Sequence, residues 1–270
     1  MNLQRNLTPW SGCPYLKSFI DSGLLIIPVS ARQKISTIDF LASCKKYHEA
    51  NDSRYVAQNY LDVVNNRKIW DNLQYVTTDI LEQEMFRKYL FAWGKMGRCF
   101  PVSKRKIFYE LLLETVVETS EVIKSLRPVR IEFARLDTDS RKEEIETLYE
   151  RFKDFCRKEY KSQPTASAKM LHIILPRLFI IWDQKFVRSQ QNLKPDSASY
   201  VKYLSTKQTQ INKLFESFRE TNPSANLADL VKDLEEQHHR FLTQELHLKE
   251  PANEPITKLL DEYQVMNPHT

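Results

Sequence analysis

Glycine is scarce in this chain, and its scarcity excludes several classes of fold and function. Only 4 of the 270 residues are glycine. Sheet-rich folds with many tight turns use glycine at positive φ, and phosphate-binding loops and dinucleotide fingerprints need closely spaced glycines. We therefore expect neither a sheet-rich fold nor a nucleotide-binding loop, and we predict an all-α, mostly helical protein with few or no strands.

Cysteine pairs and long apolar runs are also missing. The four cysteines are far apart and show no Cys-x-x-Cys spacing, so we expect neither a zinc finger nor a disulfide framework. No run approaches the roughly 18 apolar residues of a membrane span, and the N-terminus lacks the apolar core of a signal peptide. We expect a soluble, cytoplasmic, monomeric protein with no membrane partner.

Metal and cofactor motifs are likewise absent from the sequence pattern. His238 and His239 are adjacent in a charged stretch, but the pattern offers no third ligand near them. We therefore assign no metal and no cofactor.

Length and charge leave the domain number and the partner open. With 41% hydrophobic residues, 270 residues are enough for one large domain or two smaller halves. Polar residues 137–142 are the most plausible linker, which predicts an N-terminal helical lobe at 1–136 and a C-terminal helical lobe at 137–270, or one continuous unit. The net charge of +5 permits a polyanionic partner without requiring one.

Apolar periodicity and helix-breaking residues predict a succession of helices. Residues 1–33 contain three prolines and are expected to be irregular, and the chain around 129–136 is expected to be extended or loop-like. Ser36 or Thr37 is the predicted cap of the first helix, and Ser103 of the longest one. The expected helices cover 36–48, 55–64, 79–96, 103–126, 140–160, 199–220, 226–248 and 256–263.

The most informative segment is residues 165–188, the most apolar stretch of the chain. From Lys169 to Asp183, these two residues are the only amine and the only acid. A charge in such a stretch needs a structural partner or has a chemical role.

A short buried helix with Lys169 in its first turns explains the first half of this segment. Thr165 or Ser167 is the predicted cap, and Pro176 ends the helix. The helix dipole and burial both disfavour the ammonium near a helix N-terminus, so we expect a lowered Lys169 pKa and a more nucleophilic amine. The chain then returns through apolar residues and brings Asp183 back toward the start of the helix.

This arrangement resembles the catalytic segment of the helix-hairpin-helix DNA glycosylase superfamily, particularly its 8-oxoguanine-glycosylase-like members. The resemblance covers about 25 residues: a lysine at the start of a buried helix, Pro176, and the aliphatic run 178–182 ending in aspartate. It implies a two-lobed helical fold, with Lys169 attacking the anomeric carbon and Asp183 stabilising the cationic sugar or activating the nucleophile. Residues 162–168 replace the glycine-containing hairpin of the family, and the spacing of fourteen residues is about one helical turn shorter, which implies a divergent relative.

A glycosylase would also need a pocket for the extruded base and cations for the DNA phosphates. Candidates for the base pocket are Trp182, Trp93 and His172. Candidates for nucleic-acid contacts lie at helix starts or around the catalytic pair: Lys104, Arg105, Lys106, Ser167, Arg177, Lys185 and Arg188. The expected partner is double-stranded DNA with a modified or damaged base. Relatives in bacterial antiviral defence act on phage-modified bases, which makes such a base a second candidate substrate.

Simpler interpretations remain for the same residues. Asp183 could cap a helix that begins at Gln184, and Lys169 could be a surface lysine whose aliphatic stem alone is buried. The basic run 104–106 could be a solvated helix start. The alternative function is therefore a non-enzymatic helical module that binds nucleic acid or protein.

Overall fold

The all-α prediction is confirmed by the structure, a computed structural model. Its described residues are 35–51, 54–94, 96–136, 139–183, 188 and 191–267. They belong to one compact unit, Lys34–Thr270, and contain no strand. Nor does this part of the chain contain a helix with the length and apolar character needed to cross a bilayer. The expected irregular region 1–33 lies outside the described residues.

The first half of the unit follows the expected helices closely. Its main elements are α2 (Thr37–Asn51), α3 (Arg54–Val64), α4 (Arg67–Trp70), α5 (Thr78–Ile80), the π-helix η2 (Leu81–Trp93), α6 (Arg105–Glu118) and α7 (Ser120–Leu126). Ser36 caps α2, because its Oγ accepts a 3.1 Å hydrogen bond from the backbone N–H of Asp39. Ser103 is not a cap: it lies in the 3₁₀ turn Val102–Lys104, and α6 begins only at Arg105.

The second half contains the longer helices. Its elements are the 3₁₀ turn η5 (Ile131–Phe133), α8 (Asp139–Asp154), α9 (Pro164–Ile174), α10 (Ser197–Thr221), α11 (Leu227–Arg240), the π-helix η7 (Phe241–Glu245) and α12 (Ile256–Met266). The expectation that α8 reaches residue 160 is wrong. The helix ends at Asp154, whose carboxylate accepts hydrogen bonds from Ser162 and Arg157 and so holds the following residues in a turn.

The start of α9 also differs from the expected cap. Pro164 occupies the first helical position, where its missing N–H has no consequence, and Gln163 precedes it without a side-chain cap. The predicted end is confirmed, because α9 stops at Ile174, two residues before Pro176. Helix α9 thus begins one residue before Thr165, the first of the two expected caps, and Lys169 lies in its second turn.

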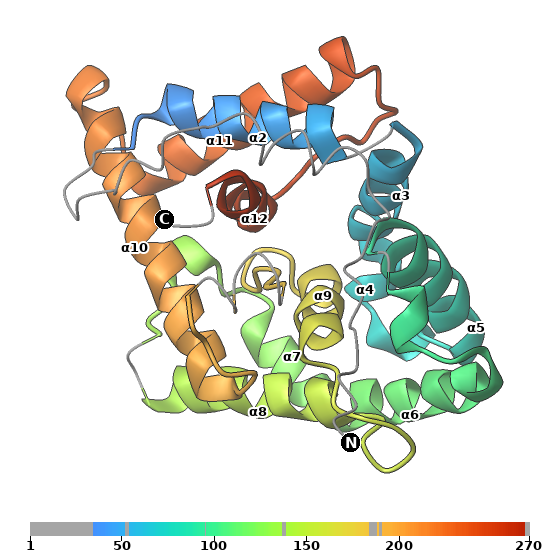
Figure 1. Cartoon of the computed structure of the whole chain (residues 1–270). Helices are drawn as coiled ribbons and strands as arrows, with labels where there is room; N and C mark the ends of the chain where they lie inside the picture. Colours follow the sequence, from blue (N-terminus) through green and yellow to red (C-terminus); the bar gives the residue numbers. More distant parts are fainter. Residues whose placement is uncertain are drawn as a thin grey trace, which may run out of the picture. The chain divides into compact units, whose positions relative to one another are not determined.

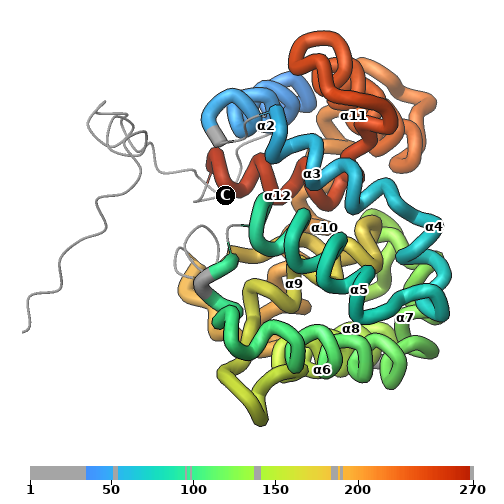
Figure 2. Tube along the Cα trace, turned by 90° about the vertical axis from the view of Figure 1, so that its right-hand side faces the viewer, coloured from blue at the N-terminus to red at the C-terminus, as the bar shows by residue number. Residues whose placement is uncertain are grey.

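The helices pack across the expected boundary at residue 137. In Figure 1 and Figure 2, α2, α11 and α12 lie on one side of the unit, α6 and α8 on the other, and α9 between them. Helices α6 and α7 contact α8, and α2 contacts α12. Residues of both expected lobes thus contribute to one core, and residues 137–138 of the expected linker lie outside the described residues.

Helix α12 is buried on every side. All nine residues from Ile256 to Gln264 are buried, and three of them carry charges: Lys258, Asp261 and Glu262. A helix that is covered all round belongs to the core, and its charges need partners there. The partners come from α2, α11 and the segment before α12.

Candidate functional site

Lys169 is held inside the protein between α9 and the end of η2. Only 8% of the residue is exposed. Its Nζ donates a 3.1 Å hydrogen bond to the carbonyl oxygen of Gly94 and lies 4.9 Å from the centroid of the Trp93 ring. The carbonyl and the aromatic face both favour a cation at this position, so they fix the amine in one place.

The charges around Lys169 include the aspartate that the sequence paired with it. Burial lowers the pKa of Lys169, and the attraction of Asp183 is the strongest opposing effect, followed by that of Asp261. Lys258 repels the ammonium and lowers the pKa further. The return of the chain after α9 thus brings Asp183 close enough to act electrostatically on Lys169, as expected from the sequence.

Asp183 lies at the edge of the described segment and is partly exposed. Its carbonyl oxygen accepts a 3.1 Å hydrogen bond from the backbone N–H of Arg188. The alternative role of Asp183 as a helix cap concerns residues 184–187, which lie outside the described residues, as does the candidate phosphate contact Lys185.

Arg188 connects the return segment to the start of α9. It is 7% exposed, and its Nη2 donates a 3.1 Å hydrogen bond to Oγ1 of Thr165. Its guanidinium lies 5.6 Å from the centroid of the Trp182 ring. Burial lowers the pKa of Arg188, while Tyr149 and Asp183 oppose this effect. Arg188 therefore joins the residues next to Asp183 to the start of α9.

The two tryptophans among the candidates for the base pocket are both buried. Trp182 donates a 3.1 Å hydrogen bond from Nε1 to the hydroxyl oxygen of Tyr149 and packs edge-on against Tyr200. Trp93 is 7% exposed and stacks on Tyr89, with ring centroids 5.0 Å apart. Trp93 is thus the candidate that lies directly against the Lys169 amine.

The third candidate, His172, links three parts of the core. Its Nδ1 lies 2.8 Å from the carbonyl oxygen of Phe179, and its Nε2 lies 2.8 Å from the hydroxyl of Tyr60. Because a carbonyl only accepts, Nδ1 carries the proton and Nε2 accepts from Tyr60. Burial lowers the His172 pKa to about 4, so the ring is neutral. Both nitrogens are used in these contacts, which tie α9 to α3 and to the return segment.

Four of the five remaining candidates for phosphate contacts have protein partners. Ser167 is buried and donates a 3.1 Å hydrogen bond to the carbonyl oxygen of Tyr149. The Lys104 amine donates to the carbonyl oxygen of Glu159, and the Arg105 guanidinium lies 4.3 Å from the centroid of the Phe91 ring. Lys106 is exposed, and Arg177 is exposed and lies 3.8 Å from a carboxylate oxygen of Glu235.

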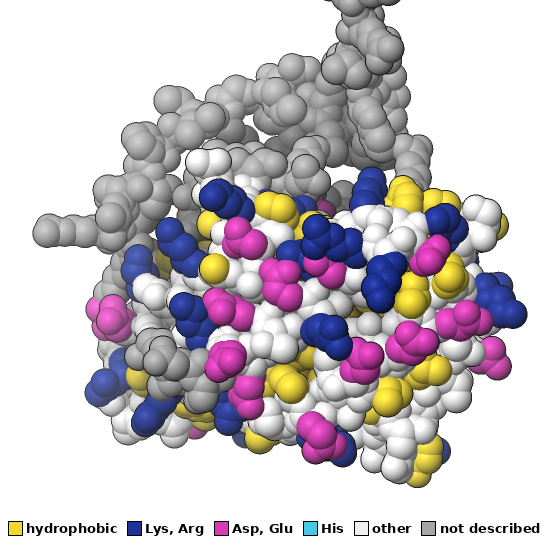
Figure 3. Space-filling model, turned by 90° about the horizontal axis from the view of Figure 1, so that it is seen from below, with side chains coloured by type: hydrophobic (Ala, Val, Ile, Leu, Met, Phe, Trp, Pro, Cys, Tyr) yellow, Lys and Arg dark blue, Asp and Glu magenta, His cyan; other side chains and the backbone are white. Residues whose placement is uncertain are grey.

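The surface formed by α6 and α8 mixes both signs of charge. Figure 3 shows basic and acidic side chains interspersed on this face. An example is the ion pair between Arg151 of α8 and Glu118 of α6. The charge on this face is therefore mixed, and the phosphate contacts expected from the basic run 104–106 stay a prediction.

The sequence pattern did not reveal the buried ions of α12. The Lys258 amine donates a 2.8 Å hydrogen bond to Oε1 of Glu262 and lies 3.6 Å from Oδ2 of Asp261. It also lies 5.3 Å from the centroid of the Trp93 ring. Burial disfavours the ammonium, but Glu262 and the other acidic neighbours outweigh burial and raise the pKa of Lys258 well above its usual value. Burial raises the pKa of Asp261 to about 6.

Beside these ions lies a quartet of two histidines and two glutamates: His48, His238, Glu254 and Glu262. Their ligand-type atoms all lie within 4.8 Å of one another, and all four residues are buried. We call this group the His/Glu quartet. No third ligand is apparent near His238 in the sequence, because the other three members of the quartet come from α2, from α12 and from the segment just before α12. One local sequence feature pointed to buried charges here: Lys258, Asp261 and Glu262 lie three or four positions apart on a short helix between two prolines.

Attraction between the members of the quartet shifts the pKa values of His48 and Glu254. Burial opposes a charge on His48, but the attraction of Glu262 and Glu254 outweighs it and raises the His48 pKa to about 10. The same attraction, with the hydrogen bond from His238, holds the pKa of Glu254 well below its usual value despite burial. The carboxylate of Glu254 is thus kept ionised in the core by its neighbours.

A third buried cation is Lys207 on α10. Its amine donates a 3.0 Å hydrogen bond to Oε1 of Gln210 and a second one to Oε1 of Gln264 on α12. Burial lowers the Lys207 pKa to about 7, and the attraction of Asp261 only partly opposes this. Lys207 is therefore a buried lysine with a depressed pKa that lies outside the predicted catalytic segment.

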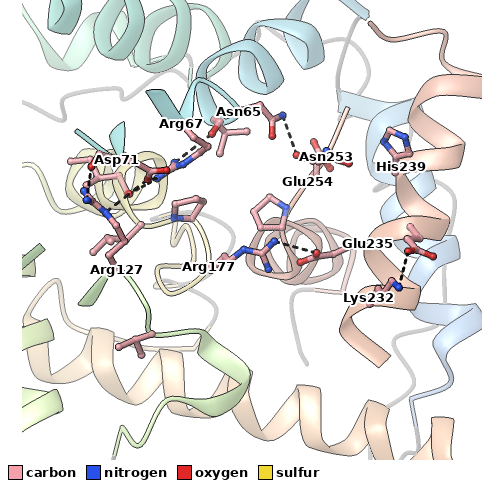
Figure 4. A pocket seen from close by; sticks show the side chains of 17 residues that line it. Asn65, Arg67, Asp71, Arg127, Arg177, Lys232, Glu235, His239, Asn253 and Glu254 are labelled. Atoms are coloured by element: carbon pink, nitrogen blue, oxygen red, sulfur yellow. Dashed lines mark hydrogen bonds and ion pairs between the residues drawn. The ribbon is translucent and has the colours of Figure 1, made fainter. Parts of the chain in front are cut away.

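An open pocket of about 600 Å³ lies at the C-terminal end of α9. Figure 4 shows that arginine side chains enter it from several elements, with Arg67 and Arg127 reaching Asp71. Glu254 of the quartet also lines the pocket. Lys169 and Asp183 do not line it, so this pocket is separate from the predicted catalytic pair.

The structure therefore presents two chemically distinct centres. One is the buried amine of Lys169 with Asp183, and the other is the His/Glu quartet next to the ions of α12. No protein-family model, curated protein or solved structure matches this chain.

Proposed function

We propose that the chain is a DNA N-glycosylase that uses Lys169 as the nucleophile or positioned amine and Asp183 as its electrostatic partner. One observation carries the proposal: the Lys169 amine is buried with a lowered pKa, and Asp183 exerts the strongest attraction on it. A lysine whose pKa is lowered is a nucleophile for a larger fraction of the time at neutral pH.

The chemistry follows from these two groups. The neutral amine attacks the anomeric carbon of the sugar, and the base leaves with the electrons of the N-glycosidic bond and takes up the proton that the attacking amine loses. Cleavage of the ring C1′–O4′ bond then gives the imine, and water hydrolyses the imine to an abasic site and the free amine. Positive charge develops on the sugar in the transition state, and a carboxylate in a site with little water stabilises that charge. Asp183 is partly exposed, which suits a group that must face a substrate.

Binding of DNA would replace one contact of the resting site. The Lys169 amine donates to the Gly94 carbonyl, and this hydrogen bond must be exchanged for the sugar. The Trp93 ring lies against the amine and is the aromatic group best placed to meet an extruded base. The proposed substrate is duplex DNA with a modified or damaged base, and a base modified by a phage would place the enzyme in antiviral defence.

The alternative is a non-enzymatic helical module that binds nucleic acid or protein through its basic helix starts. The contacts of Lys104 and Arg105 with the protein itself, and the mixed charges on the face shown in Figure 3, lend this alternative less support. A module of this kind would also have no need of a buried amine with a lowered pKa.

Borohydride trapping on DNA distinguishes the two functions. Only an amine nucleophile forms an imine with the sugar that borohydride reduces to a stable cross-link. The full chain should be incubated with duplexes that carry normal, oxidised and phage-modified bases, and abasic sites should be counted in parallel. We expect cross-links and abasic sites on at least one modified duplex, and their loss in Lys169→Gln.

The matched control is another buried lysine with a lowered pKa. Lys207→Gln should keep the cross-link, because Lys207 lies on α10 outside the proposed site. Asp183→Asn should lower the rate of base release while the protein stays folded. A cross-link that persists in Lys169→Gln contradicts the site, and the absence of both cross-links and abasic sites on every duplex contradicts the enzyme.

A further inference from the structure

We propose that the His/Glu quartet binds one divalent transition-metal ion, with zinc as the preferred ion. Two imidazoles and two carboxylates are a ligand set that zinc accepts. The four residues come from α2, α11, the segment before α12 and α12 itself. This site is independent of the proposed glycosylase chemistry.

The distances fit a four-coordinate ion. Ligands about 2.0–2.2 Å from a tetrahedral zinc lie about 3.3–3.6 Å from one another. The Nε2 atoms of His48 and His238 are 3.3 Å apart, and Oε2 of Glu254 lies 3.4 Å and 3.0 Å from them. Glu262 lies 3.0 Å from Nε2 of His48 through Oε1 and 3.6 Å from Nε2 of His238 through Oε2. Small shifts would place all four ligand atoms around one ion.

Hydrogen bonding within the quartet is incomplete. Oε1 of Glu254 and Oε2 of Glu262 are buried and find no hydrogen-bond donor among the described residues. The Nε2 atoms of His48 and His238 also lie 3.3 Å apart, and at most one of them can donate a hydrogen bond to the other. An ion between them would engage both nitrogen lone pairs and the carboxylates together. Each Nε2 already lies 3.0 Å from one carboxylate oxygen, and an ion would take the place of the protons in these contacts.

The local charges balance with a divalent ion. Glu254 and Glu262 supply two negative charges to the ion, and the neighbouring Lys258 has Asp261 as a second acidic partner at 3.6 Å. With neutral imidazoles, the metal and its ligands are neutral as a group, and so is the Lys258–Asp261 pair. A neutral assembly avoids the cost of an uncompensated charge in the core.

The site is closed, and this favours a structural role. All four ligands are supplied by the protein and are at most 2% exposed. Such a site would join α2, α11 and α12, and through Lys258 it would help to fix the helix that lies against Trp93. Glu254 also lines the open pocket, which offers a path by which an ion can enter.

Metal binding by the full chain tests this inference. The protein should be stripped with a chelator, dialysed against Zn²⁺ and analysed for bound metal, and its affinity should be measured against a chromophoric chelator. We expect one Zn²⁺ per chain. Substitution with Co²⁺ should give the intense visible absorption of a tetrahedral site.

Neighbouring histidines provide a matched pair of variants. His238→Gln removes a ligand, whereas His239→Gln alters a residue that contacts the Ala252 carbonyl and Glu250 outside the quartet. We expect His238→Gln and Glu254→Gln to weaken Zn²⁺ binding at least about 100-fold, since even outer-shell changes cost ~10–100-fold. His239→Gln should bind as the wild type does.

The wild-type chain alone tests the metal site, whether or not the variants fold. A wild-type chain that takes up no stoichiometric Zn²⁺, or gives only the weak spectrum of octahedral Co²⁺, would overturn it. Equal loss of zinc in His238→Gln and His239→Gln, with both variants folded by circular dichroism, would overturn it as well.

Discussion

The Nε2 atoms of His48 and His238 lie 3.3 Å apart in the core, although 190 positions separate the two residues in the sequence. Glu254 and Glu262 surround this contact, and Lys258 adjoins Glu262. Buried charges in such a group depend on one another, because each one compensates the cost of removing another from water.

Loss of one acid from this group should strongly destabilise the fold. Glu262→Gln leaves Lys258 and His48 without their nearest carboxylate. Removal of one partner from a buried ion pair typically costs about 3–5 kcal/mol, so we expect a fall of this size in the free energy of unfolding, measured with denaturant in metal-free buffer. Glu121→Gln, in an exposed pair with Lys124, is the control and should change stability by less than about 0.5 kcal/mol. Equal stability of the two variants would contradict the prediction.

Lys207 should make stability rise with pH. Its folded pKa of about 7 is below the value of 10.5 that the unfolded chain retains, so between these values the unfolded state binds more protons. The free energy of unfolding should therefore gain about 2 kcal/mol from this group between pH 7 and 9. The groups that face its amine are Gln210, Gln264, Asp261 and the Tyr203 ring.

Replacement of Lys207 by methionine isolates its contribution. Lys207→Met keeps the length of the side chain and removes the titrating amine, so the difference in stability between wild type and variant should change with pH over this range. Denaturant unfolding at several pH values between 7 and 9 measures this difference. A difference that stays constant across the range would show that Lys207 is not the group responsible.

His172 should make the protein sensitive to acid. Its folded pKa of about 4 is below the usual 6.5, so the native state binds fewer protons than the unfolded state between these values. The stabilisation of the fold by the neutral His172 ring is complete above pH 6.5, and about 3 kcal/mol of the free energy of unfolding should be lost as the pH falls to 4. Charged groups near the ring are Lys258, Glu254 and Arg67.

A variant without a titrating ring tests this assignment. His172→Gln loses the contacts to Tyr60 and Phe179 and should be less stable at pH 7, but its stability should fall less steeply from pH 6.5 to 4 than that of the wild type. Thermal or denaturant unfolding across this range gives both slopes. Parallel slopes for the two proteins would refute the role of His172.

Local signals in the sequence were sufficient to place most helices. Ser36, one of the two expected caps, caps α2. Helix α11 begins directly after Asn226, close to its expected start, and Pro176 ends α9, because capping and the steric effect of proline act over a few residues. The corrections are local too. Ser103 lies in a 3₁₀ turn, and α8 ends early because Asp154 bonds to a residue eight positions later.

Only some contacts of the Lys169 site could be predicted from the sequence. The apolar sequence around Lys169 indicated that this amine is buried, and the return of the chain indicated its closeness to Asp183. Its contact with Gly94 was not predictable, because it joins residues 75 positions apart. Trp182 was expected at a pocket, but it is fully buried in an aromatic cluster.

The all-α class, the helix positions and the buried amine of Lys169 follow from the sequence, because periodicity, caps and prolines act within one or two helical turns. The surroundings of α12 depend on tertiary packing. Its charges would suit a solvated helix face, and only the packing of α2 and α11 around it makes Lys258 and Glu262 interior ions. Distant helices thus assemble the His/Glu quartet, since burial and charge compensation depend on neighbours in space.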